Sequence, residues 1–400
     1  MNILRYLSAN YIFPVSSPPL CNGIVCVNDI GCIVDVTDTG GKLKEREKLE
    51  FYNGILVPGF VNAHCHLELS HLKGSIETLA GLPSFISSVG KKRNADAESI
   101  AIAAKAADEE MGRNGIVAVG DISNTDNTLN IKRKSRIYYH TFVELFGLDD
   151  FRADQIFATG VELQQKYVNA RLSASITPHA VYSVSPTLWD TLSQSYQSSP
   201  PQVISIHHQE SGEETNIFPE GKGELAAALR EKGLLTGGRI LSRDIWSQMI
   251  RCLSESPRSL LVHNTFTTKA DLIKYQSQPE RFYFVLCPKS NLFIQSRLPN
   301  FSLFCAPELR HNICLGTDSL ASNTKLSILE EMKIIQQNAP EIPLSTLLQW
   351  ATHNGARALG IEHLFGSFEK GKTSGVNLIT GIDFSKMQLT ASSEIKVIVK

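Results

Sequence analysis

The sequence lacks the features of a membrane-bound or nucleic-acid-binding protein. No stretch approaches the roughly 20 consecutive apolar residues that span a bilayer. The first residues, MNILRYLSANYIFPVSSPP, lack the continuous apolar segment of an export signal. Lys and Arg number 39 against 40 Asp and Glu, so the formal charge is -1 and there is no basic excess to attract a nucleic acid. We therefore expect a cytoplasmic protein with no membrane or nucleic-acid partner.

Paired cysteines are missing as well. The 8 cysteines are scattered along the chain and include no Cys-x-x-Cys pair. Without an export signal, this distribution favours reduced thiols over disulfides. Repeats at solenoid spacing and low-complexity segments are also absent. What the chain does contain is 42% hydrophobic and 20% charged residues, a balance that predicts a compact globular core.

Short Val- and Ile-rich segments alternate with longer segments of helical period over most of the chain. This alternation is typical of βα units around a parallel sheet. Eight strand candidates follow from it, and eight repeats predict a closed (β/α)8 barrel of the TIM type. The strand candidates are ILVPGFVNAHCH, GIVAVGDIS, RIYYHTFVEL, ARLSASITPH, VISIHHQES, SLLVHNTF, FYFVLCPKS and NICLGTDSL.

The two chain ends follow a different pattern. Residues 1–56 contain short alternating segments separated by Gly, Pro and Asn, and residues 361–400 contain Gly-punctuated segments of the same kind. We expect both ends to fold together. The prediction is an α/β protein with a barrel over residues 57–360 and a small β-sandwich domain formed by both termini.

Polar side chains fall at the C-terminal ends of the strand candidates, where barrel enzymes place their chemistry. His64 and His66 are spaced i, i+2, so both point to one face of the strand and can hold one ion. With His207 and Asp318 they form a set of three nitrogens and one oxygen that suits zinc or Fe(II). The alternative for His207 is a buried core histidine without a metal, and the alternative for Asp318 is a helix N-cap. The polar strand-end residues are His64, His66, Asp121, Glu144, His179, His207, Glu210, His263, Asn291 and Asp318.

Six segments follow one another in the order PGFVNAHCHLELS, TPHAVYS, IHHQESGEE, LLVHN, CPKSN and LGTDSLASN. Together they resemble the amidohydrolase superfamily, in its branch of purine, triazine and thioadenosine aminohydrolases, over nearly the whole chain. The resemblance implies a small-molecule substrate and one divalent metal, zinc, with iron as the alternative. A homodimer stays open as the assembly. The implied metal ligands are His64, His66, His207 and Asp318.

The resemblance also implies catalytic roles for three residues. Glu210 matches the proton-shuttling carboxylate and His263 the histidine on the sixth strand. Deamination of an aromatic amine needs a proton on the ring nitrogen and another on the leaving nitrogen, which a carboxylic acid beside the metal can deliver. Asp318 can accept a proton from the attacking water, and His263 can hydrogen-bond that water.

Two further residues are candidates for contact with the substrate. His179, in TPHAVYS, resembles the position at which this branch places a substrate-contacting histidine, with plain packing as the alternative. Glu68, two residues beyond His66, can reach into the pocket, with a solvated loop charge as the alternative. His208 and Cys65 should face away from the metal, because neighbours on a strand point to opposite sides.

The leading hypothesis is a metal-dependent hydrolytic deaminase acting on an aminated purine nucleoside-like ring. The segment HCHLELSHLKG resembles the aminodeoxyfutalosine deaminases of menaquinone biosynthesis. Deaminases of S-adenosylhomocysteine, methylthioadenosine or adenosine are the close alternative, and hydrolases of halotriazines or guanine are more remote. A catalytically silent binding or scaffold protein of the same fold is the alternative from another class, and metal content discriminates it from the enzyme.

Overall fold

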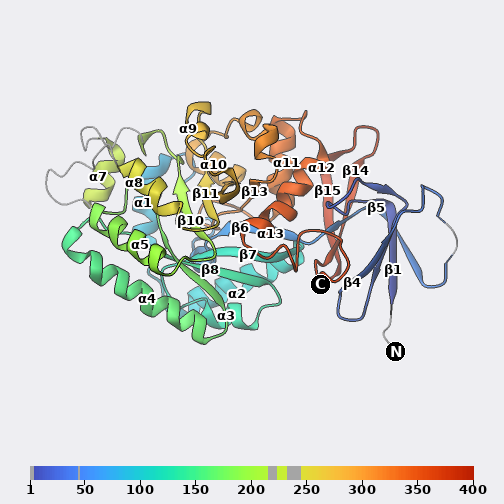
Figure 1. Cartoon of the computed structure of the whole chain (residues 1–400), viewed down its shortest axis with the longest axis horizontal. Coiled ribbons are helices and arrows are strands. Elements are labelled where there is room, and N and C mark those ends of the chain that lie inside the picture. The colour runs from blue at the N-terminus through green and yellow to red at the C-terminus, as the bar shows by residue number, and fades with distance from the viewer. Residues whose placement is uncertain (1–3, 44–45, 215–222, 232–244) are drawn as a thin grey trace.

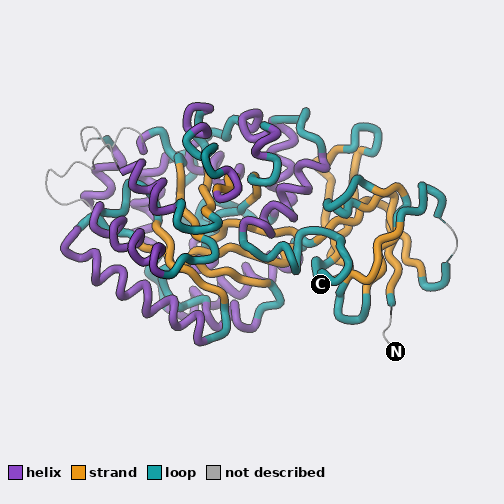
Figure 2. Tube along the Cα trace, in the orientation of Figure 1, coloured by secondary structure: helices purple, strands orange, loops and turns teal. Residues whose placement is uncertain are grey.

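The chain folds into a large α/β body and a smaller body of β-strands (Figure 1). The computed structural model describes residues 4–43, 46–214, 223–231 and 245–400. In that part of the chain no helix combines the length and the apolar character that crossing a membrane would require. Strands lie inside the larger body and helices cover them on the outside (Figure 2).

Two four-stranded parallel sheets form the centre of the larger body. Between their edges, Ala180 forms a parallel bridge with His207. At the other edges the N–H groups of Thr317 and Asp318 donate to the carbonyl of His64 at 3.0 and 3.1 Å. The eight strands therefore close into a barrel of the TIM type, as predicted. They are β6 (Phe60–Cys65), β7 (Ile116–Ser123), β8 (Tyr138–Leu145), β9 (Ser173–Pro178), β10 (Ile204–His208), β11 (Ser259–His263), β12 (Phe282–Leu286) and β13 (Ile313–Leu315).

The surrounding helices begin where their local sequence supplies a cap. Ser185 accepts a hydrogen bond from the Leu188 N–H, and Pro186 occupies the first helical position, so α5 starts there. The helices described are α1 (Gly81–Lys92), α2 (Ala97–Arg113), α3 (Leu129–Lys134), α4 (Ala153–Asn169), α5 (Pro186–Ser198), α7 (Glu224–Glu231), α8 (Ile245–Leu253), α9 (Lys269–Ile273), α10 (Pro288–Gln295), α11 (Ile328–Asn338), α12 (Leu344–Ala351) and α13 (His353–Ala358).

The smaller body is one seven-stranded sheet that combines both chain ends. Its order is β15-β14-β5-β1-β3-β4, with β2 paired to β1. Leu7, Val25, Leu56 and Leu378 pack together in a core separate from that of the barrel. The two termini therefore share a domain, as predicted, and the boundaries at residues 57 and 360 stay a proposal. The strands are β1 (Arg5–Ile12), β2 (Leu20–Cys21), β3 (Ile24–Val27), β4 (Ile33–Thr37), β5 (Leu49–Pro58), β14 (Val376–Asp383) and β15 (Gln388–Val399).

Candidate metal centre and active site

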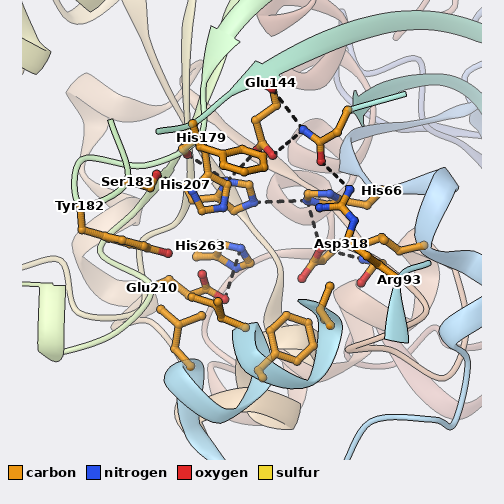
Figure 3. Close-up of a pocket in the computed structure, with 18 of the residues that line it drawn as sticks. His66, Arg93, Glu144, His179, Tyr182, Ser183, His207, Glu210, His263 and Asp318 are labelled. Atoms are coloured by element: carbon orange, nitrogen blue, oxygen red, sulfur yellow. Dashed lines mark hydrogen bonds and ion pairs between the residues drawn. The ribbon is translucent and has the colours of Figure 1, made fainter. Parts of the chain in front are cut away.

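A cavity lies at the C-terminal ends of the barrel strands (Figure 3). Polar side chains from seven of these strand ends line one part of it, and apolar side chains of α1 line another. This is the end of the barrel at which the sequence placed its candidates. The polar lining residues include His66, Arg93, Asn124, Glu144, His179, His207, Glu210, His263 and Asp318.

Three of the predicted metal ligands are histidines that lie close together, and two of them, His66 and His207, line this cavity. Ring nitrogens of His64, His66 and His207 lie within 4.8 Å of one another. The Nε2 atoms of His66 and His207 are 3.2 Å apart. Both ring nitrogens of His64 are buried and have no hydrogen-bond partner among the residues that the structure describes, which is costly for a polar group. A cation between the rings would supply the missing partner, so these residues fit a metal.

Asp318, the fourth predicted ligand, turns one carboxylate oxygen towards these rings. Its Oδ1 lies 3.8 Å from His64 Nε2 and 3.6 Å from His66 Nε2. The hydroxyls of Ser290 and Ser322 donate to Oδ2 at 2.6 and 2.8 Å and hold the carboxylate in place. The backbone of Asp318 has φ 56°, a left-handed conformation that non-glycine residues adopt at a cost and that is common at functional sites.

The protonation states of these four groups suit a divalent cation. Burial lowers the pKa of His64 well below its ordinary value and lowers that of His66 to about 3. Burial also lowers the pKa of His207. For Asp318, burial would raise the pKa, but the nearby His66 and His263 together with the hydrogen bonds from Ser290 and Ser322 outweigh burial, and the pKa is lowered. Neutral imidazoles and an ionised carboxylate are the forms that bind metal.

Glu210 and His263 face each other beside this set. Burial, together with the charge of Asp318, raises the pKa of Glu210 well above its ordinary value. Its Oε1 lies 3.6 Å from His263 Nε2. Asn291 Oδ1 lies 2.9 Å from His263 Nδ1, so Nδ1–H donates there and Nε2 is left towards the cavity. A buried carboxyl group that holds its proton is suited to act as a general acid.

The turn that presents Glu210 is organised by a residue that sequence reasoning missed. The carboxylate of Glu214 accepts the backbone N–H groups of Gln209, Glu210 and Ser211 at 3.0, 2.6 and 3.0 Å. Burial raises the pKa of Glu214 to about 8. Gln209 has φ 47°, so the turn leaves the strand in a left-handed conformation that these hydrogen bonds stabilise.

His179 lines the cavity and also supports His207. Its ring centroid lies 4.7 Å from that of His207. Its backbone carbonyl accepts the His207 N–H at 2.8 Å and lies 3.0 Å from His207 Nδ1. The second contact places a proton on Nδ1 and leaves Nε2 as the nitrogen that faces the other ligands. Contact between His179 and a substrate stays a prediction.

Glu68 does not line the cavity, contrary to the expectation that it reaches into the pocket. It lies in a 3-10 helix, η1 (Leu67–Leu72), directly after His66. One carboxylate oxygen accepts from Arg93 Nη2 at 3.1 Å, and the other accepts the N–H groups of Asn124 and Thr125 at 3.1 and 3.2 Å. The side chain is 4% exposed, so it is not a solvated loop charge either. Arg93 and Asn124 line the cavity in its place.

His208 and Cys65 face away from the predicted ligands, as expected from strand alternation. His208 Nδ1 lies 2.9 Å from Asn264 Oδ1, and its Nε2 lies 2.7 Å from the Tyr275 hydroxyl. Cys65 is fully buried, and burial raises the pKa of its thiol well above the ordinary value. Neither residue lines the cavity.

A buried ion pair supports the strand that carries His64 and His66. Lys132 Nζ, from α3, lies 2.6 Å from Asp121 Oδ2 at the end of β7, and both side chains are fully buried. The other oxygen of Asp121 accepts the N–H of Leu67 at 2.7 Å. Leu67 directly follows His66. The pair therefore holds the end of β6 in position from behind the cavity.

Replacing Lys132 with Met is expected to destabilise the protein by about 3–5 kcal/mol, because it leaves Asp121 buried without its counter-charge. Denaturant unfolding measures this loss. The double variant Asp121→Asn, Lys132→Met removes both charges and should recover most of the stability. A single variant that unfolds within about 1 kcal/mol of the wild type would show that the pair contributes little.

Comparison with known proteins adds three findings to this geometry. The sequence profile of the amidohydrolase family matches residues 55–390. An adenosine deaminase of Helicobacter pylori is 27% identical over 336 residues, which cover 82% of this chain and 79% of that protein. An aminodeoxyfutalosine deaminase of Nitratiruptor is 25% identical over 337 residues, covering 82% of this chain and 79% of that protein.

Solved structures include a similar fold. The crystal structure of Helicobacter pylori aminofutalosine deaminase in complex with methylthio-coformycin superposes with a TM-score of 0.79 at 25% identity. The match covers 96% of this chain and 94% of that one. It therefore includes the barrel and the strands of both termini.

Proposed function

Because this chain belongs to the amidohydrolase family, we propose that it is a metal-dependent hydrolytic deaminase of 6-aminopurine nucleosides. The observation that carries the proposal is the position of Glu210, a buried acid with a raised pKa, within the cavity that also holds the histidine cluster. The deaminases among its relatives support the same reaction. A silent scaffold protein has no use for a buried acid next to a set of metal ligands.

We propose His64, His66, His207 and Asp318 as the ligands of one divalent ion. Three imidazole nitrogens and one carboxylate oxygen suit zinc, and they leave room for a water molecule. A divalent ion held by these residues would lower the pKa of water and so supply hydroxide near neutral pH. All eight cysteines are unpaired, which agrees with the proposed cytoplasmic location.

The side chains around this set divide the proton transfers among them. Glu210 donates its proton to the ring nitrogen next to the amino-bearing carbon. Asp318 accepts a proton from the attacking water, and His263 Nε2 hydrogen-bonds that water and orients it. Glu210 then takes the second proton of that water from the hydroxyl of the addition product and delivers it to the leaving nitrogen, and the proton held by Asp318 returns to Glu210. Water and the aminated ring thus give ammonia and a ring that carries oxygen.

Among 6-aminopurine nucleosides we propose aminodeoxyfutalosine, an intermediate of menaquinone biosynthesis, as the substrate. The segment HCHLELSHLKG and the likeness to the Helicobacter pylori aminofutalosine deaminase support it. Adenosine is the second candidate, because a relative of similar identity is an adenosine deaminase. Ammonia release from metal-replete protein, scored over a panel of both compounds, methylthioadenosine and S-adenosylhomocysteine, tests the ranking. No release from any of them, with no bound metal, would favour the scaffold protein.

An analogue in which CH replaces the ring nitrogen next to the amino-bearing carbon should bind with modest loss but react far more slowly. Glu210 would have no atom to protonate, and general acid catalysis contributes roughly 10²–10⁴-fold. The effect should appear in kcat, because the interaction is made chiefly in the transition state. Steady-state kinetics of the matched pair measure it. Equal kcat values for the two compounds would contradict the proposed mechanism.

A further inference from the structure

One carboxylate in the cavity is not used by the reaction described above. Glu144 closes β8, and its side chain is 4% exposed. Its Oε1 is buried, and no residue in the described part of the chain forms a hydrogen bond with it. The Nδ1 atom of His207 lies 3.4 Å from this oxygen. Figure 3 shows Glu144 beside His207, on the side away from Asp318.

The other oxygen of Glu144 is fixed by a chain of polar contacts. Asn124 Nδ2 donates to Glu144 Oε2 at 3.2 Å and to its backbone carbonyl at 3.1 Å. Arg93 Nη2 donates to Asn124 Oδ1 at 2.9 Å and to Glu68 Oε1 at 3.1 Å. Glu68 lies two residues beyond His66. The contacts therefore run along one wall of the cavity from the end of β6 to His207 on β10.

These contacts fix the position of Glu144 Oε1 beside the ring of His207. Its side chain cannot rotate freely, because Oε2 is held by Asn124. Oε1 lies next to the nitrogen of His207 that bears the proton, since Nδ1 also faces the carbonyl of His179 at 3.0 Å. A carboxylate behind a ligating imidazole fixes the ring orientation and raises the basicity of the metal-facing nitrogen.

We propose that Glu144 is a positioning residue that orients His207 for the metal, and that Glu68, Arg93 and Asn124 hold it in place. The inference rests on the proposed function, because it takes His207 to be a ligand. It also gives Glu68 a role: the residue acts on the site through Arg93 and Asn124, without reaching the cavity itself.

Two other roles for Glu144 make different predictions. Glu144, His179 and His207 offer ligand atoms within 4.8 Å of one another, so a second ion could use them. Alternatively, Glu144 could bind a donor group of the substrate, because it lines the cavity. A second ion changes the metal stoichiometry, and a substrate contact changes KM. The positioning role changes the affinity for a single ion.

The test is zinc affinity, measured without substrate by competition with a chromogenic chelator, for wild type, Glu144→Gln, Glu144→Ala and Asn124→Ala. Loss of a group behind a metal ligand typically lowers metal affinity roughly 10–100-fold. We expect this loss for Glu144→Ala, a smaller loss for Glu144→Gln, whose amide oxygen can still lie beside Nδ1, and a smaller loss for Asn124→Ala. The control is Glu162→Gln, an exposed residue on α4 of the same βα unit, which should match the wild type.

The double variant Glu144→Ala, Asn124→Ala makes the test specific. If Asn124 acts only by holding Glu144, the double variant should bind zinc no more weakly than Glu144→Ala alone. In the cobalt-substituted protein, the visible absorption bands should shift in Glu144→Gln and stay unchanged in Glu162→Gln. Glu144→Gln keeps the volume of the side chain, so it carries the test if the alanine variant does not fold.

Three outcomes would overturn the proposal. Zinc affinity that is unchanged in Glu144→Ala would show that His207 does not depend on Glu144. Two ions per wild-type chain and one per Glu144→Ala chain would assign Glu144 to a second metal site. A raised KM with unchanged zinc affinity would assign it to the substrate. Only the KM comparison requires a substrate. Zinc affinity and zinc stoichiometry do not, so failure of the proposed substrate class would leave the zinc measurements interpretable.

Discussion

Replacing His66 or Asp318 with Ala is expected to remove bound metal and deaminase activity together. His66 is central to the cluster, because its Nε2 lies 3.2 Å from His207 Nε2 and 3.6 Å from Asp318 Oδ1. Either variant removes one of the four proposed ligands, and because each ligand contributes to the binding free energy of the ion, metal affinity should fall steeply. Elemental analysis of the purified variants measures the metal, and ammonia release measures the activity.

The matched control is His208→Gln. His208 is also a buried histidine at the end of β10, but its ring nitrogens face Asn264 and Tyr275 instead of the cavity. This variant should lower the free energy of unfolding and keep a full complement of metal. Full metal content and full turnover in His66→Ala or Asp318→Ala would show that the ligand assignment is wrong.

The barrel could be predicted from the sequence because its signals are local. Each strand is a short apolar run bounded by turn residues, and a helical period follows it. The polar residue that closes a run marks the strand end, so the positions of His207, Glu210, His263 and Asp318 at the same end of the barrel could be inferred before any packing was known. Alternation along a strand likewise indicated that His208 faces away.

The contacts that surround the proposed ligands could not be predicted, because they join segments that are distant in the sequence. Glu68 sits next to His66 in sequence, yet its partner Arg93 comes from the end of α1 and Asn124 from the end of β7. Nothing in the motif around His66 indicates that a guanidinium will lie in front of the carboxylate. Glu144 carried a signal, its place at a strand end, but its neighbour His207 lies two strands further round the barrel.

The backbone conformation at the site could not be predicted from sequence patterns either. His263 and Asp318 have φ values of 79° and 56°, although neither is a glycine. Such conformations are maintained only where surrounding contacts outweigh their cost. Here the contacts are the hydrogen bonds from Ser290 and Ser322 to Asp318 and the pairing of His263 with Asn291. These partners belong to other segments and become visible only in the folded chain.

Glu210→Gln should keep the metal and lose most of the turnover. The residue is not a proposed ligand, so zinc content should match the wild type. Gln has the same shape but no proton to transfer, and a general acid contributes roughly 10²–10⁴-fold, with a larger loss where one group acts twice. The variant should unfold no more easily than the wild type, because burial raises the pKa of Glu210 and a neutral amide avoids that cost. Metal analysis, single-turnover kinetics and denaturant unfolding give the three readouts.

Glu214→Gln separates this chemistry from the folding of the turn. Glu214 is a second buried glutamate four residues away, but its oxygens bind backbone N–H groups and do not line the cavity. The amide of Gln retains one acceptor oxygen, so the variant keeps part of the turn and should lose some stability. Its turnover should be only moderately slower, because the altered turn displaces Glu210. If Glu210→Gln kept near-normal turnover while Glu214→Gln lost it, catalysis would depend on the conformation of the turn and would not depend on the carboxyl proton of Glu210. Asp318 would then be the first candidate for the proton donor, because its carboxylate lies beside His66 and lines the cavity.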